Sequence, residues 1–193
     1  MVSSKDAVAG PKKREPAPAQ RSGGWYAALA LESSYSSPLS DEDRAELDKA
    51  RQRLASSDAA EPAKKRLLEY AAKATGQGAG RFASLQAEAV INGFLDGKVP
   101  PARIDFEVRF MDAWCGDRVA EFAESERSEL LQKTEGSERT MLDRMIGMAV
   151  TRSRYLMAAA VSALRVYYDD TAPQERRAML EKAITVLEST NPG

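Results

Sequence analysis

From residue 40 onward, apolar side chains recur every three or four positions, which is the spacing of one face of an α-helix. The clearest stripe follows Pro101, and its members are Ile104, Val108, Met111, Cys115, Val119 and Phe122. No segment alternates apolar and polar residues over the length of a strand. The pattern therefore predicts an all-α fold.

Start and stop signals divide this pattern into about five to six helices. The segment 40–43 (Ser-Asp-Glu-Asp) is typical of a helix start, because the hydroxyl can accept a backbone N–H and acids favour the positive helix end. Glycine and proline mark most other boundaries. The helices are predicted to begin at Ser40, Pro62, Arg81, Pro101, Ser137 or Thr140, and Thr171, and the fourth and fifth are predicted to extend to about Gly136 and Tyr168. We expect a helical bundle with an extended N-terminal arm.

Bulky side chains are concentrated in the third and fourth predicted helices. All five phenylalanines, together with Trp114, lie between residues 82 and 122. The fifth predicted helix is instead rich in alanine and methionine, and Met141, Met145 and Met148 form a row along it. Its apolar face is wide, which indicates contact on more than one side. The aromatic core is expected in helices three and four, and Trp114 is expected to be buried there.

The composition predicts three regions along the chain. Residues 1–24 form a basic Pro/Gly-rich tail, residues 25–39 an apolar docking patch with a Ser-rich linker, and residues 40–193 a single all-helical domain. The tail has five basic residues against two acidic ones, a net charge of +3. Because the whole chain carries −1, the remainder carries −4. A basic tail on an acidic body favours attachment to an anionic partner, although the same arrangement also occurs without that role.

The residue counts exclude several kinds of chemistry. The 193 residues include no histidine, which excludes His-containing zinc sites and Ser-His or Cys-His catalysis. The single cysteine, Cys115, cannot form an intramolecular disulfide, which favours a reducing, cytoplasmic compartment. No apolar run reaches the length of a membrane span. No residue is a candidate for catalysis or for binding a metal or cofactor.

Three local features have a structural interpretation that outweighs the functional one. Cys115 lies on an apolar stripe near Asp112, which favours an inert core thiol over a nucleophile. An acidic helix face favours a solvated or partner-facing surface over a cation site. The methionine row favours core filling over an adaptable binding surface. The acidic face consists of Asp117, Glu121 and Glu124.

Two groups of residues are candidates for binding a partner. One is the tail and the patch that follows it, where basic side chains could attract an acidic surface and two aromatic side chains could anchor on it. Its members are Lys12, Lys13, Arg14, Arg21, Trp25 and Tyr26. The other is a set of arginines on the fifth predicted helix that could contact phosphate. Its members are Arg144, Arg152 and Arg154.

The function predicted from these observations is a non-catalytic structural or adaptor subunit. It would act through protein–protein contacts in a larger assembly, which could be self-assembled, and its N-terminal arm would reach the partner. One alternative is a small nucleic-acid-associated helical protein that uses the basic tail and the arginines of the fifth helix. A helical chaperone or sensor is a second alternative.

Overall fold

The structure is a computed structural model that describes residues 38–76, 79–151 and 154–189. Within these ranges the chain forms eight α-helices and one short 3₁₀-helix, and no strand. The helices are α2 (Asp41–Ala55), α3 (Glu61–Lys73), α4 (Gly80–Leu95), α5 (Pro101–Cys115), α6 (Val119–Leu131), α7 (Gly136–Ala149), α8 (Arg154–Leu164), η3 (Arg165–Tyr167) and α9 (Pro173–Ser189). The predicted all-α class is confirmed, whereas the predicted number of five to six helices is wrong.

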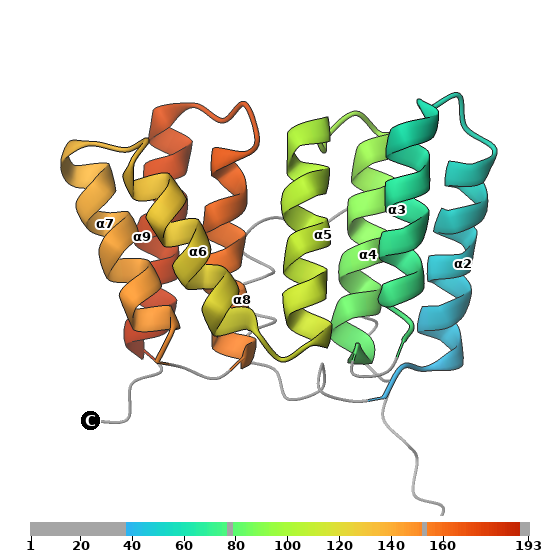
Figure 1. The fold of residues 1–193 in the computed structure, drawn as a ribbon, viewed down its shortest axis with the longest axis horizontal. Coiled ribbons are helices and arrows are strands. Elements are labelled where there is room, and N and C mark those ends of the chain that lie inside the picture. The colour runs from blue at the N-terminus through green and yellow to red at the C-terminus, as the bar shows by residue number, and fades with distance from the viewer. Residues whose placement is uncertain (1–37, 77–78, 152–153, 190–193) are drawn as a thin grey trace, which may run out of the picture.

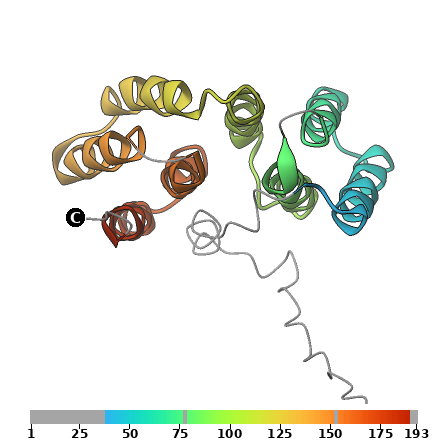
Figure 2. The ribbon, with the colours of Figure 1, turned by 90° about the horizontal axis from the view of Figure 1, so that it is seen from below.

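The helices form two lobes of four. Helices α2–α5 make up one half of the molecule, the N-lobe, and α6–α9 make up the other, the C-lobe (Figure 1). In both lobes, helices two apart in the chain pack on each other: α2 on α4, α3 on α5, α6 on α8 and α7 on α9. In a view nearly along the helix axes, α2 lies at one end of the molecule, and α7 and α9 lie at the other (Figure 2).

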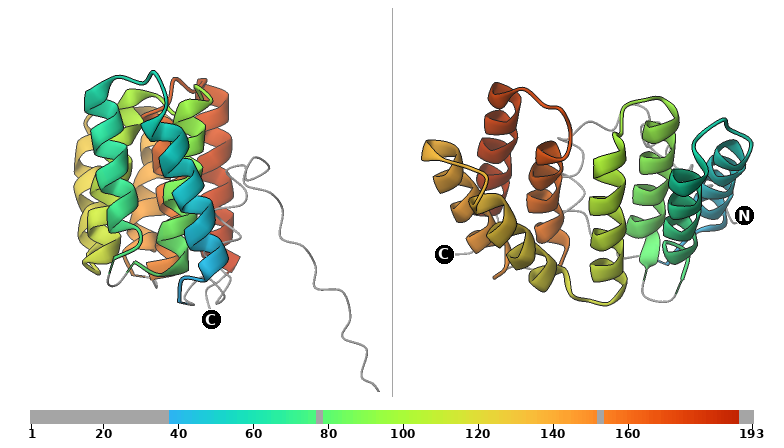
Figure 3. Two further views of the ribbon diagram at one scale, coloured as in Figure 1. Left: turned by 90° about the vertical axis from the view of Figure 1, so that its right-hand side faces the viewer. Right: turned by 45° about the horizontal axis from the view of Figure 1, so that its top comes forward.

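The lobes meet mainly where α5 packs on α6. Helix α5 belongs to the N-lobe, and the short connection after it leads directly into α6 (Figure 3). Side chains of η3 and of the residues that follow it complete this contact, and they are described below as the junction. The arrangement resembles a short stack of helical hairpins more than a bundle around a single axis.

The capping signals at the start of the domain have the predicted geometry. Asp43 donates its backbone N–H to the Ser40 hydroxyl at 3.1 Å, and its carboxylate accepts from the Ser40 backbone N–H at 3.3 Å. This reciprocal pair is a capping box, and it confirms the predicted helix start. Pro62 lies in the first turn of α3, also as predicted.

The predicted fourth helix is wrong in its length, because it is two helices, α5 and α6. After Cys115 the Arg118 N–H bonds to the Ala113 carbonyl at 2.7 Å, and the Asp117 N–H bonds to the Trp114 carbonyl at 3.2 Å. This pair of bonds is a Schellman motif, which requires a left-handed residue directly after the cap. Asp117 takes that position, with φ of 55°. The helix therefore ends there without a glycine at the left-handed position.

The predicted fifth helix is also two helices, α7 and α8. Helix α7 ends at Ala149, and Val150 is its C-cap. Thr151 follows, and its hydroxyl donates to the Met148 carbonyl at 3.0 Å. Two successive β-branched residues lower the helix propensity at this point, although neither is a strong breaker. The wide apolar face expected of one long helix is accordingly divided between α7 and α8.

The predicted aromatic core is confirmed. Trp114 is buried, its ring centroid lies 4.1 Å from that of Phe82, and its indole N–H donates to the Ala79 carbonyl at 3.0 Å. Phe110 packs edge-on against Phe82, with centroids 6.2 Å apart. In the C-lobe, apart from Phe122 at the boundary with the N-lobe, the buried apolar side chains are smaller or more flexible. They include Leu142, Met145, Ile146, Ala149, Ala160, Ala163 and Leu180.

Candidate functional site

Charged side chains are buried at the junction between the lobes. The side chains of Glu107 on α5 and Glu126 on α6 are completely excluded from solvent, and that of Arg165 on η3 is 3% exposed. Buried charges are costly unless they are paired and hydrogen-bonded. Their presence between two lobes singles out this region as the candidate functional site.

Glu107 is the centre of the first ionic cluster. One carboxylate oxygen lies 2.6 Å from the Arg165 Nε and 3.3 Å from the Arg103 Nε. The other accepts a hydrogen bond from the Gln86 side-chain amide at 2.8 Å. Three helices, α4, α5 and η3, therefore converge on one carboxylate. Because η3 belongs to the C-lobe, this cluster joins the two lobes.

Asp169 extends the same cluster to the turn that follows η3. It accepts a hydrogen bond from the Arg103 guanidinium at 2.9 Å. Burial raises the pKa of Asp169 above its ordinary value, and the attraction of Arg103 offsets this only in part. Arg103 thus bridges Glu107, within its own lobe, and Asp169, in the other.

Glu126 is the centre of a second cluster on the α6 side of the junction. Its carboxylate accepts hydrogen bonds from the Arg109 guanidinium and from the Tyr168 hydroxyl. Burial and the neighbouring Glu126 raise the pKa of Tyr168, so its hydroxyl remains a donor at neutral pH. The Arg109 Nη2 also lies 3.4 Å from the Tyr168 hydroxyl. This cluster connects α5, α6 and the segment after η3.

Aromatic rings fill the space between the two clusters. The ring centroid of Phe106 lies 4.7 Å from that of Tyr168 and 5.2 Å from that of Phe122. The Arg165 guanidinium lies over the ring of Phe110, at 5.4 Å from its centroid. Low-dielectric surroundings of this kind strengthen the ion pairs while making each unpaired charge costly.

The contacts of the junction hold helices of the two lobes together. Each buried carboxylate is held by at least one arginine and one further donor. Both carboxylates therefore serve as hydrogen-bond acceptors within the protein, which suits the fixing of helix positions. Removing one member would leave the others buried without compensation. The geometry therefore ties the orientation of the C-lobe to that of the N-lobe.

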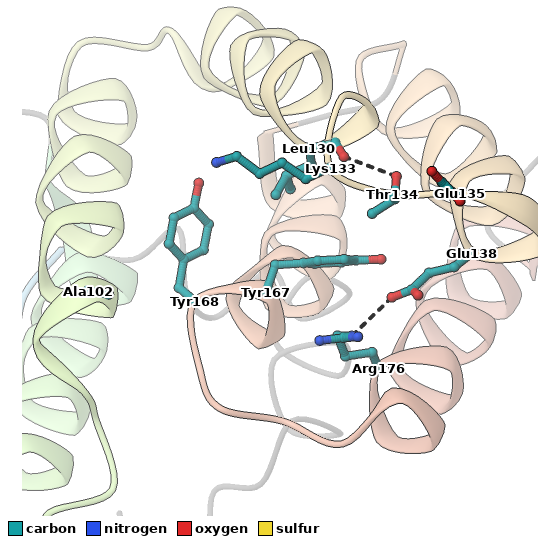
Figure 4. A pocket seen from close by; sticks show the side chains of 9 residues that line it. All are labelled: Ala102, Leu130, Lys133, Thr134, Glu135, Glu138, Tyr167, Tyr168 and Arg176. Atoms are coloured by element: carbon teal, nitrogen blue, oxygen red, sulfur yellow. Dashed lines mark hydrogen bonds and ion pairs between the residues drawn. The ribbon is translucent and has the colours of Figure 1, made fainter.

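A pocket of about 640 Å³ adjoins the junction. It is bordered by the start of α5, the end of α6 and the loop after it, the start of α7, the end of η3 and the start of α9 (Figure 4). Its volume is within the range of small-molecule sites. The lining residues are Ala102, Leu130, Lys133, Thr134, Glu135, Glu138, Tyr167, Tyr168 and Arg176.

The arginines predicted to contact phosphate are engaged at separate places. Arg144 on α7 pairs with Glu188 on α9. The Arg154 guanidinium lies 4.0 Å from the ring centroid of Trp114, and it is 3.9 Å from the Asp117 carboxylate. Arg152 lies outside the described residues. Arg144 and Arg154 thus contact different partners on different helices, and phosphate binding stays a prediction.

The tail and the patch that follows it cannot be placed against the junction. The six residues predicted to bind a partner all lie in 1–37, outside the described residues. The same holds for the basic tail and for most of the docking patch and linker. Their roles stay predictions.

The other side chains that the sequence singled out lie away from the junction. Cys115 is half-buried, and burial raises the pKa of its thiol, which disfavours the reactive thiolate. Asp117 and Glu121 are exposed, and Glu124 pairs with Arg127 at 3.0 Å. In the methionine row, Met145 is buried, whereas Met141 and Met148 are partly buried against the core.

Sequence reasoning missed the junction, although a weak signal for it exists. Arg165 directly follows an apolar run that includes Met157 and Leu164, and a charge beside such a run can indicate a buried partner. Glu107 lies among the aromatic residues of α5, between Phe106 and Phe110. Neither position identifies its partner, because Glu107 and Arg165 are 58 positions apart in the chain.

Two kinds of feature are not found in the part of the chain that the structure describes. No group of three or more Cys, Asp or Glu side chains there could hold a metal ion. No described helix has the length and apolar character needed to cross a membrane.

No protein-family model, no curated protein and no solved structure matches this chain. The class is therefore defined by the geometry of the described residues, which form two four-helix lobes without strands and with a buried ionic junction between them.

Proposed function

We propose that this protein is a non-catalytic helical adaptor that binds a protein partner as part of a larger assembly. The observation that carries the proposal is the packing of helices two apart in the chain, which repeats in both lobes. Helical-repeat proteins are built in this way, and their stacked helices provide extended surfaces for partners. The helix architecture supports an interaction role, and the junction supports it independently.

The junction supports an adaptor because it fixes how the two lobes face a partner. A surface that spans both lobes is useful for recognition only when the lobes hold one relative orientation. Glu107 and Glu126 tie α5 to elements of the C-lobe through arginine and tyrosine contacts. Buried ion pairs are retained in some proteins for such specificity rather than for stability.

The N-terminal arm is the segment that we assign to partner contact. Its charge of +3 would guide it toward an acidic surface, over a distance of about 8 Å at physiological salt. Trp25 and Tyr26 would then contribute the apolar contact area that anchors an interface. Self-association is one form of the proposal, with the acidic segment 117–138 of a second copy as the surface that receives the arm.

The test compares the full chain with a chain that lacks residues 1–31. Sedimentation velocity over a wide range of concentrations would measure self-association, and quantitative capture from the cells that make the protein would measure other partners. We expect the truncated chain to keep the helical circular dichroism of the full chain and to lose association. Trp25→Ala with Tyr26→Ala should reproduce the loss, whereas Ser36→Ala with Ser37→Ala serves as the matched control.

Two results would contradict the proposal. A full chain that remains monomeric, and that captures the same proteins as the truncated chain, would show that the arm binds no partner. Association that requires nucleic acid and disappears after nuclease treatment would favour the alternative of a nucleic-acid-associated protein. Binding to nucleic acid would also be expected to weaken steeply as the salt concentration rises.

A further inference from the structure

The pocket beside the junction has a set of hydrogen-bond donors that the fold does not use. Arg176 bonds to Glu138 through its Nε at 3.1 Å, while its two terminal nitrogens form no hydrogen bond with the described residues. Its guanidinium lies over one face of the Tyr167 ring, 5.7 Å from the centroid (Figure 4). The Nε contact orients the guanidinium and leaves the terminal donors available.

Tyr167 adds a second donor to the same pocket. Its hydroxyl is buried beside the Glu138 carboxylate, and it has no well-formed hydrogen bond within the described part of the chain. Burial and the nearby Glu138 carboxylate raise the pKa of Tyr167, so the hydroxyl stays protonated at neutral pH. A buried hydroxyl whose hydrogen bond is poorly formed is costly, and a ligand that accepts a well-aligned hydrogen bond from it would lower that cost.

The remaining walls combine apolar surface with charged side chains of both signs. Ala102 and Leu130 line the pocket beside the rings of Tyr167 and Tyr168. Lys133 lies at its exposed border, where it pairs with Glu129 at 2.6 Å. Of the two acidic lining residues, Glu138 is engaged by Arg176, and Glu135 is exposed. The unused groups are therefore donors on one side and apolar surfaces on the other.

We propose that this pocket binds an aromatic carboxylate, with the carboxylate on Arg176 and the Tyr167 hydroxyl and the aromatic ring against Leu130, Ala102 and the tyrosine rings. A planar guanidinium is well suited to a carboxylate, and ring-to-ring packing suits an aromatic group. The same chemistry is available from a free aromatic acid and from a peptide that ends in phenylalanine. The proposal does not require the adaptor function, because the pocket is formed by this chain alone.

The experiment is isothermal titration calorimetry on the full chain with four probes. Phenylacetate represents the free acid, and acetyl-Gly-Gly-Phe with a free carboxylate represents the peptide end. Benzyl alcohol and the same peptide as its amide are the uncharged counterparts. We expect at least one carboxylate probe to bind at least about tenfold more tightly than its uncharged counterpart, since charge-assisted hydrogen bonds are the stronger ones. Whichever carboxylate binds identifies the source of the ligand.

Neighbouring arginines on α9 provide a matched pair of variants. Arg176→Gln should weaken binding at least about tenfold, because it removes the charge that meets the carboxylate. Arg177→Gln should leave binding unchanged, since Arg177 is exposed and pairs with Glu181 outside the pocket. Ala102→Leu should also weaken binding, because it fills the apolar wall without changing any charge. Equal binding by the two arginine variants, equal binding of charged and uncharged probes, or no binding of either carboxylate would overturn the proposal.

Discussion

The two lobes have the same number of helices and similar packing, but they are stabilised by different side chains. The N-lobe encloses Trp114, Phe82 and Phe110, whose rings contact one another. The C-lobe encloses mainly aliphatic side chains, methionine and alanine, including Met145 and Ala160, and its buried Phe122 packs toward the N-lobe. One helix arrangement is thus compatible with two kinds of core, since packing volume and apolar pattern matter more than residue identity.

The boundary between the lobes shows how the two kinds of core are joined. The aromatic cluster does not end with the N-lobe: Phe122 of α6 packs on Phe110, with centroids 5.7 Å apart, and Tyr168 packs on Phe106. Buried charge is concentrated in the same layer. The junction is therefore built as a continuation of the N-lobe core, to which the C-lobe contributes aromatic and charged side chains.

The largest expected effect is that of removing Trp114. Trp114→Ala should lower the free energy of unfolding by about 3–5 kcal/mol, because the site loses a buried ring and its hydrogen bond to Ala79. Met145→Ala is the matched change in the C-lobe, and it should cost less, about 2–3 kcal/mol, since a smaller side chain is lost. Urea denaturation followed by circular dichroism measures both. A Trp114→Ala loss below that of Met145→Ala would contradict the comparison.

The next effect concerns the junction. Glu107→Gln keeps the size of the side chain but leaves Arg165 buried beside a neutral group, and it should cost about 3 kcal/mol. The control is Glu188→Gln, which breaks the exposed pair with Arg144 and should cost about 0–1 kcal/mol. The same denaturation measurement applies. Equal losses for the two variants would show that the buried junction does not fasten the lobes.

Two glycines should respond with opposite sign to the same substitution. A Cβ on Gly93 in α4 would lie 2.8 Å from the Val99 Cγ2, so Gly93→Ala should destabilise by about 1–3 kcal/mol. A Cβ on Gly147 in α7 would meet nothing within 4 Å, so Gly147→Ala should stabilise by about 0.5–1 kcal/mol through the higher helix propensity of alanine. Thermal denaturation gives both signs. In a Val99→Ala background, which lacks the Cγ2 atom, Gly93→Ala should cost less than it does in the wild type. An equal cost in the two backgrounds would exclude the clash as the cause of the loss.

The smallest expected effect is a difference in pH dependence between two aspartates. Burial raises the pKa of Asp43, but the hydrogen bonds from Ser40 and Arg81 outweigh it and lower that pKa below 3.8. Its stabilising contribution is therefore complete above pH 3.8 and is lost as the pH falls through the lowered value. The pKa of Asp169 is raised above 3.8, so its contribution is complete below pH 3.8 and is lost as the pH rises through the raised value.

Urea denaturation at several pH values on both sides of 3.8 distinguishes the two carboxyls. The stability advantage of the wild type over Asp43→Asn should shrink on acidification below pH 3.8. Its advantage over Asp169→Asn should instead grow as the pH is lowered toward 3.8. Parallel pH profiles for the two variants would contradict the opposite directions of the two pKa shifts.

Local sequence signals predicted helix starts better than helix ends. Ser40 and Pro62 gave correct starts because capping depends on neighbouring residues. The ends of α4 and α5 use the same Schellman bonds, yet only α4 has glycine, Gly97, at the left-handed position. At the end of α5 that position is occupied by Asp117, while the adjacent Gly116 is only the cap. No local sequence signal therefore marks the end of α5, and the predicted helix continues through it.

The candidate site could not be predicted from local sequence signals, for a different reason. Trp114 could be predicted as buried because its apolar neighbours on the same helix imply a core. Glu107 and Arg165 are far apart in the sequence, and their pairing depends on how α5 meets η3. The pocket likewise requires five separate segments to converge. Such features follow from tertiary packing, which periodicity along a single helix does not specify.

The buried junction is expected to hold the two lobes in one relative orientation, because Glu107 and Glu126 tie α5 to elements of the C-lobe. The most direct measurement is the distance distribution between spin labels on Gln52→Cys in α2 and Lys182→Cys in α9, both exposed, in a Cys115→Ala background. We predict one narrow distribution that broadens when Glu107→Gln is added while the helical circular dichroism is retained. A distribution that is already broad with Glu107 present, or one that Glu107→Gln leaves unchanged, would contradict the claim.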